Sequence, residues 1–105
     1  MKIAILLPYK ENYSHYDTGA VSIFVNGVNK LSKFKNNIKI YGSTPHKPLS
    51  KNYKNLSLKK NLFQSSSRVY VKDFLKKIEN KKIDILEIHN RPHYLKFLLK
   101  LKHTK

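Results

Sequence analysis

The chain contains no cysteine among its 105 residues, and this absence excludes several kinds of structure and chemistry. Without cysteine there is no disulfide framework, no thiolate metal site and no cysteine nucleophile. Long apolar runs are missing as well, whereas a transmembrane helix needs about 20 consecutive apolar residues. The apolar run at residues 3–7 ends at Pro8 with no small-residue cleavage site after it, so we expect no signal peptide. We therefore expect a cytoplasmic protein.

Acidic residues and arginine are also scarce. Six Asp and Glu face 22 Lys and Arg, which gives a net charge of +16, and the arginines are Arg68 and Arg91. Such a charge suits nucleic acid, an anionic membrane surface or an acidic substrate. Proteins that read nucleic acid rely on arginine for bidentate contacts, and here the cations are nearly all lysine. A lysine-rich coding composition and a functional basic face both stay open as explanations.

Four short segments have the composition of β-strands. Lys2–Leu7 is almost wholly apolar, which is typical of a parallel strand that is buried on both faces. Ile38–Tyr41 and Asp84–Ile88 predict two further strands, and Leu56–Leu58 indicates a short one.

Helical periodicity separates these strands. From Gly19 onward, apolar residues recur at steps of three and four and predict one buried helix face: Val21, Phe24, Val25, Val28, Leu31 and Phe34. Asp17 or Thr18 is expected to cap this helix by accepting a bond from a free backbone N–H. A second helix follows Ser65–Ser67 with its own apolar face, made by Val71, Phe74, Leu75 and Ile78. Tyr94–Leu101 predicts the start of a third helix.

Strands that alternate with helices predict an α/β fold, a Rossmann-like parallel sheet with helices on both faces. We expect a single domain over residues 1–105. A doubly wound sheet usually has about five or six strands, and this sequence supplies three or four. We therefore expect an incomplete, N-terminal portion of a larger domain; a naturally small α/β domain is the alternative.

Ligands of open α/β sheets bind at the carboxyl ends of the strands, and two loops leave such ends. One is Pro8–Thr18 and the other His89–Pro92, and they would face each other across a crevice. The first loop leads to Gly19-Ala20 at a helix start, where free N–H groups favour an anion such as a phosphate. Gly19 could equally serve close packing. Neither G-x-G-x-x-G nor G-x-x-x-x-G-K-[ST] is present, so the dinucleotide and P-loop fingerprints do not apply.

The second loop concentrates polar groups directly after a strand. His89 can act near neutral pH as a base or donor, and Arg91 can hold a carboxylate or phosphate. Alternatively, both side chains serve only the loop and the solvent. We expect no metal and no cofactor, because Pro92 separates His89 from His93 and no third ligand is evident. In the first loop, tyrosines could stack on a ligand or shield the end of the sheet: Tyr9, Tyr13 and Tyr16.

These motifs resemble the start of a GT-B glycosyltransferase with a subfamily 4-like N-terminal domain. Residues 2–8, a variable loop and Gly19-Ala20-Val21-Ser22 before an apolar helix match its first motif. Residues 82–90, Lys-Ile-Asp-Ile-Leu-Glu-Ile-His-Asn, match a later strand of the form Asp-Ile-Ile-His-x-His-Asn. Ala20 stands where a second Gly is commoner, and Glu87 stands where the family often has its first His. The resemblance covers the whole chain but only about a third of such an enzyme.

The resemblance implies an N-terminal, acceptor-side part of an enzyme that transfers a hexose from a nucleotide-sugar to a lipid-linked or polysaccharide acceptor. Gly19 and Ala20 would contact the donor phosphates, and His89 would be the catalytic residue at the transferred sugar. The acceptor pocket would be shaped by Tyr9, Asn90 and Arg91. Most of the donor site would lie in a C-terminal domain with a Glu-x7-Glu motif, which this sequence lacks. The lysines are compatible with peripheral attachment at the inner face of the membrane.

Two other functions remain as alternatives. The charge of +16 suits a small nucleic-acid-binding module, but aromatic and basic residues do not interleave on a strand as stacking platforms require. No helix-turn-helix, zinc or RRM signature is present, so we expect no nucleic-acid partner. The other alternative is an inactive, truncated fragment.

Overall fold

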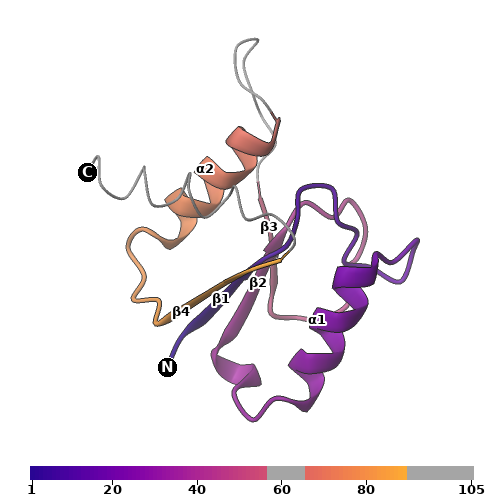
Figure 1. Cartoon of the computed structure of the whole chain (residues 1–105), viewed down its shortest axis with the longest axis horizontal. Coiled ribbons are helices and arrows are strands. Elements are labelled where there is room, and N and C mark those ends of the chain that lie inside the picture. The colour runs from indigo at the N-terminus through magenta and orange to yellow at the C-terminus, as the bar shows by residue number, and fades with distance from the viewer. Residues whose placement is uncertain (57–65, 90–105) are drawn as a thin grey trace.

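Four parallel strands form one sheet in the order β3-β2-β1-β4, with helices α1 and α2 on its two faces (Figure 1). The computed structural model of the chain describes residues 1–56 and 66–89. The elements are β1 (Ile3–Leu6), α1 (Ala20–Leu31), a 3-10 turn η1 (Lys35–Asn37), β2 (Ile38–Gly42), β3 (Tyr53–Asn55), α2 (Ser66–Ile78) and β4 (Ile85–Ile88). The predicted α/β class with helices on both faces is confirmed.

Alternation along β1 creates two cores. Ala4 and Leu6 point to one face, where they pack with Tyr70 and Phe74 of α2. Ile5 and Leu7 point to the other face and pack with Val25 of α1. Because successive side chains of a strand point to opposite faces, an unbroken apolar run is what a strand covered on both sides requires.

The buried face of α1 differs from the predicted one. Val25 is buried, but the other two buried residues of α1 are the polar Ser22 and Asn29. Several of the apolar residues that we expected to be buried are exposed instead: Phe24, Val28, Leu31 and Phe34. Asn29 is buried because its side chain pairs with Asn52, whose amide donates to the Asn29 Oδ1 at 2.9 Å. The predicted helical period is correct, but the buried face lies about a quarter-turn round the helix from the predicted face.

The third strand lies earlier in the chain than predicted. β3 consists of Tyr53–Asn55, and Leu56 follows it with its N–H bonded to the Gly42 carbonyl at 2.7 Å. Polar residues dominate this short edge strand, so hydrophobic patterning does not detect it. Residues 57 and 58 of the predicted strand, and the predicted third helix at residues 94–101, lie outside the described residues.

The direction in which the chain moves across the sheet reverses between β1 and β4. The chain passes from β1 to β2 and then β3, and α2 returns it to the other side of β1. Such a switch point is where open α/β sheets bind ligands, at the carboxyl ends of the strands. Within residues 1–56 and 66–89, no helix has the length and apolar character needed to cross a membrane.

Candidate functional site

The loop after β1 and the residue after β4 lie at the same edge of the sheet. β1 pairs with β4 in parallel, and Leu6 stands opposite Ile88 at the carboxyl ends of the two strands. The predicted neighbourhood of these two strands is therefore confirmed, and it brings Pro8 and His89 to one edge. Pro8 is buried, and its carbonyl accepts the Glu11 N–H at 3.0 Å, which turns the chain directly after β1.

A carboxylate from this loop lies at the start of α1. Gly19 is the N-cap residue and has no side chain with which to cap the helix, whereas the Glu11 carboxylate accepts the Ser22 N–H at 3.0 Å. The expected cap by Asp17 or Thr18 is wrong: Thr18 donates its hydroxyl to the Ser14 carbonyl instead. Helix N-termini favour anions because free N–H groups and the helix dipole point at them. Glu11 is such an anion, supplied by the chain itself.

Gly19 is needed for this contact. A Cβ atom at Gly19 would collide with the carboxylate of Glu11, so any larger residue would displace that side chain. Ala20 follows as the first, exposed residue of α1. The Ser22 hydroxyl is completely buried and has no hydrogen-bond partner within the described part of the chain. The helix start thus combines backbone donors, an orphaned hydroxyl and a displaceable carboxylate.

His89 stands on the same face of the sheet as α1. Its Nε2 lies 2.7 Å from the Glu87 Oε2, and its ring meets the Phe24 ring edge-on with centroids 6.1 Å apart. The His89 side chain is 18 % exposed and that of Glu87 is 49 % exposed. Glu87 orients the imidazole through this contact. A ligand that reached this edge would meet the oriented and partly accessible imidazole of His89.

The tyrosines of the first loop have different surroundings. Tyr9 packs against the α2 face of the sheet, with its ring 5.5 Å from that of Tyr70, so it lies across the sheet from the α1 core. Tyr13 is fully buried and stacks on Tyr53, and Tyr16 is 68 % exposed beside His46. Of the two roles open to Tyr13, shielding the end of the sheet is the one the structure supports.

Tyr13 also fixes the loop that carries Glu11. Its hydroxyl lies 2.8 Å from the Ser50 Oγ, and its backbone N–H donates to the Thr44 hydroxyl at 2.9 Å. Burial raises the pKa of Tyr13 above its ordinary value, while the bond from Ser50 partly offsets this rise. The loop is therefore held by buried hydrogen bonds to the segment that follows β2.

The structure brings Gly19, Ala20 and His89 to the α1 side of the switch point, with Tyr9 on the α2 side. Asn90 and Arg91, predicted to shape an acceptor pocket, lie outside the described residues.

Sequence reasoning missed four residues as parts of this edge: Glu11, Ser22, Glu87 and Phe24. Glu87 could have been found, because residues i and i+2 of a strand share a face. Glu11 could not, because its position depends on the path of an irregular loop.

No protein-family model, curated protein or solved structure matches this chain. The candidate site therefore depends on its own residues and their geometry.

Proposed function

We propose that this chain is the acceptor-side part of a nucleotide-sugar-dependent glycosyltransferase. In the reaction, the oxygen of an acceptor hydroxyl bonds to the anomeric carbon of a hexose as the bond from that carbon to the nucleoside diphosphate breaks. The diphosphate leaves with the bonding electrons, and the hydroxyl proton is released. The observation that supports the proposal most directly is the pairing of β1 with β4, which sets the loop before α1 and His89 at one edge. The sequence resemblance at these same two segments supports it as well.

The start of α1 would hold the donor phosphates. A phosphate there would replace the Glu11 carboxylate as the acceptor of the Ser22 N–H, and the buried Ser22 hydroxyl would gain a partner. Gly19 would let the phosphate approach the backbone, as it now lets Glu11 do. These donors would stabilise the leaving diphosphate, because dipoles aimed at a developing charge act most strongly in a site that excludes water.

His89 would hold the transferred sugar. Glu87 would keep the imidazole oriented through the contact at 2.7 Å, so that the other ring nitrogen donates to or accepts from a sugar hydroxyl. Phe24, 60 % exposed on α1, would offer an apolar ring for the sugar face beside His89. Asn90, Arg91 and Tyr9 would complete the acceptor pocket, and most of the donor site would belong to a second domain.

The test is a sugar-transfer assay on the polypeptide encoded by the whole reading frame that contains these residues. We expect His89→Ala to lower the transfer rate by about a hundredfold, since a misplacement of the reacting group by about 1 Å can cost that much. His15→Ala is the matched control, because His15 is an exposed histidine of the loop at residues 9–18. Equal rates for the two variants would overturn the assignment of His89.

A further inference from the structure

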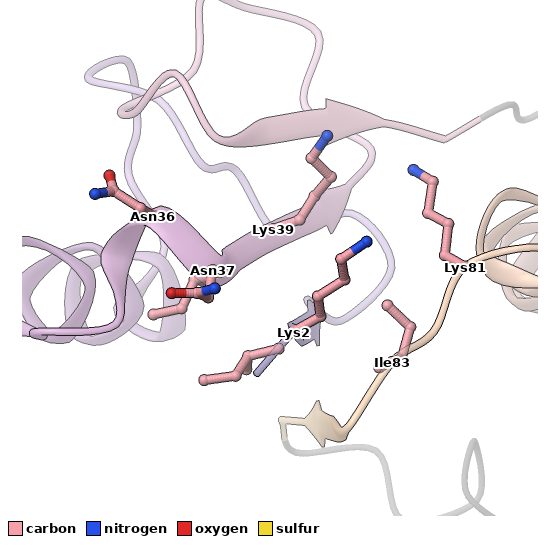
Figure 2. Close-up of a pocket in the computed structure, with 8 residues that line it drawn as sticks. Lys2, Asn36, Asn37, Lys39, Lys81 and Ile83 are labelled. Carbon is pink, nitrogen blue, oxygen red and sulfur yellow. The ribbon is translucent and has the colours of Figure 1, made fainter.

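A second polar site lies at the opposite edge of the sheet, at the amino-terminal ends of the strands. A hollow of about 280 Å³ opens there between β1, β2 and the segment that joins α2 to β4 (Figure 2). Its lining among the described residues consists of Lys2, Ile3, Asn36, Asn37, Ile38, Lys39, Lys81 and Ile83. Since it faces away from the carboxyl ends of β1 and β4, it is separate from the site of the proposed sugar transfer.

Three lysines from distant segments converge on this hollow. Lys39 pairs with Ala4 across β1 and β2, and Lys2 precedes Ala4 by two residues, so both lysines lie on the α2 face. Lys81 enters from the turn after α2, where its N–H bonds the Ile78 carbonyl at 3.0 Å. Figure 2 shows the three side chains with their amino groups turned toward a common space.

The backbone around the lysines is fixed. The Lys2 N–H donates to the Asp84 carboxylate at 2.7 Å, and the Lys2 carbonyl accepts the Asp84 N–H at 2.9 Å. The sheet therefore sets where Lys2 and Lys39 begin, and the end of α2 sets where Lys81 begins. A ligand would need to order only the outer side chains, which lowers the entropic cost of binding.

The charges of this cluster are not neutralised from within. No acidic residue is among the described residues that line the hollow, and within residues 1–56 and 66–89 the three ammonium groups make no hydrogen bond or ion pair. The Asp84 carboxylate accepts the backbone N–H of Lys2. Three like charges around one space repel each other, and a multivalent anion would relieve that repulsion.

We propose that this hollow binds phosphate groups that carry two or more negative charges. Lysine binds phosphate as a point charge, and Asn36 and Asn37 add uncharged residues to the lining of the hollow. The volume is just below the roughly 300–1,000 Å³ of sites for small ligands. A diphosphate, a triphosphate or a phosphorylated sugar fits this size, and so does the phosphate of a lipid headgroup.

The experiment compares two triple variants of the 105-residue chain. Lys2→Gln/Lys39→Gln/Lys81→Gln removes the cluster, and Lys30→Gln/Lys47→Gln/Lys51→Gln removes the same charge from exposed lysines that do not line the hollow. Calorimetric titration with inorganic triphosphate measures the soluble ligand. Sedimentation with vesicles of phosphatidylcholine and phosphatidic acid, against phosphatidylcholine alone, measures the lipid headgroup.

We expect the cluster variant to lose affinity for at least one probe by about tenfold or more, and the control variant by less than about threefold. Loss with triphosphate identifies a free phosphorylated ligand, and loss only with vesicles identifies a lipid headgroup. Equal weakening of both variants, or no binding of either probe to the wild-type chain, would overturn the proposal. The proposal would also be overturned if the wild-type chain bound an oligonucleotide more tightly than either probe and both variants weakened that binding equally.

A measurement on the unaltered chain keeps the proposal testable if the cluster variant does not fold. In a nuclear magnetic resonance titration with triphosphate, the backbone amides of Lys2, Asn37, Lys39 and Lys81 should shift together with one binding constant. Shifts spread evenly over the exposed lysines of the chain would contradict a defined site.

Discussion

Glu11 and the start of α1 show how one residue can occupy the place of a ligand. Its carboxylate accepts the Ser22 N–H at 3.0 Å and lies against the backbone of Gly19. An anion at this position stabilises a helix by about 0.3–1 kcal/mol. The same carboxylate repels any phosphate that approaches, so the donor would have to displace it. Glu11 is therefore expected both to support the fold and to weaken anion binding.

We predict that Glu11→Gln strengthens anion binding at the start of α1. Removing one negative charge beside the bound anion should lower the pyrophosphate concentration needed for half-saturation by about tenfold. The amide shifts of Ala20 and Ser22 report this site in a magnetic resonance titration. The amides of Lys2 and Lys39, at the other edge of the sheet, are the internal control. Unchanged half-saturation at Ala20 and Ser22 would argue against a phosphate site there.

The exposed face of α1 shows why periodicity alone does not assign a buried side. Phe24, Val28 and Leu31 form an exposed apolar stripe, yet the buried residues of α1 are Ser22, Val25 and Asn29, with Val21 packed beside them. Asn29 is satisfied by Asn52, and Asn52 also donates to the Ile38 carbonyl at 3.0 Å. A polar network between α1 and the segment before β3 therefore replaces part of the apolar contact.

Two substitutions in α1 separate these faces. Val25→Ala should lower the free energy of unfolding by about 2 kcal/mol, because it leaves a cavity at a side chain only 2 % exposed. Leu31→Ala should change it by less than about 0.5 kcal/mol, because Leu31 is 90 % exposed. Urea unfolding followed by circular dichroism measures both. A larger effect at Leu31 than at Val25 would mean that the apolar stripe is covered in solution.

The sequence predicted strands and helices best where their apolar pattern was strong. β1, β2, β4 and the two helices lie within a few residues of their predicted positions, because long apolar periods dominate those segments. β3 was displaced, since Tyr53–Asn55 has little apolar character and is fixed by pairing with β2. For the candidate site, strand pairing placed Pro8 and His89 at one edge as predicted, but loop geometry alone determined that Glu11 caps α1. The lysine hollow required the sheet register, which brings residues 2 and 39 together, and the turn after α2, which adds residue 81.

Across the whole molecule, tyrosines occupy both layers beside the sheet. Tyr13 and Tyr53 stack on the α1 side, with ring centroids 5.4 Å apart, while Tyr41 packs edge-on against Phe74 of α2. Burial raises the pKa of all three phenols above the ordinary value of 10.0. The Ser50 bond lowers that of Tyr13, Lys77 lowers that of Tyr41 and Thr44 lowers that of Tyr53, each less than burial raises it.

These raised values make the fold sensitive to alkali. Above about pH 10 the unfolded chain loses its phenolic protons while the folded chain keeps them, so the folded state binds more protons. The contribution of these phenols to the free energy of unfolding should therefore be constant below that pH and fall as the pH rises toward their folded-state pKa values. Tyr13→Phe removes one such proton and should make the fall less steep, although it also loses the contact with Ser50.

Tyr16→Phe is the matched control, because Tyr16 is 68 % exposed, and its pH profile should follow that of the wild-type chain. Urea unfolding between pH 8 and pH 12 measures all three slopes, and an identical slope for Tyr13→Phe and wild type would show that Tyr13 does not contribute.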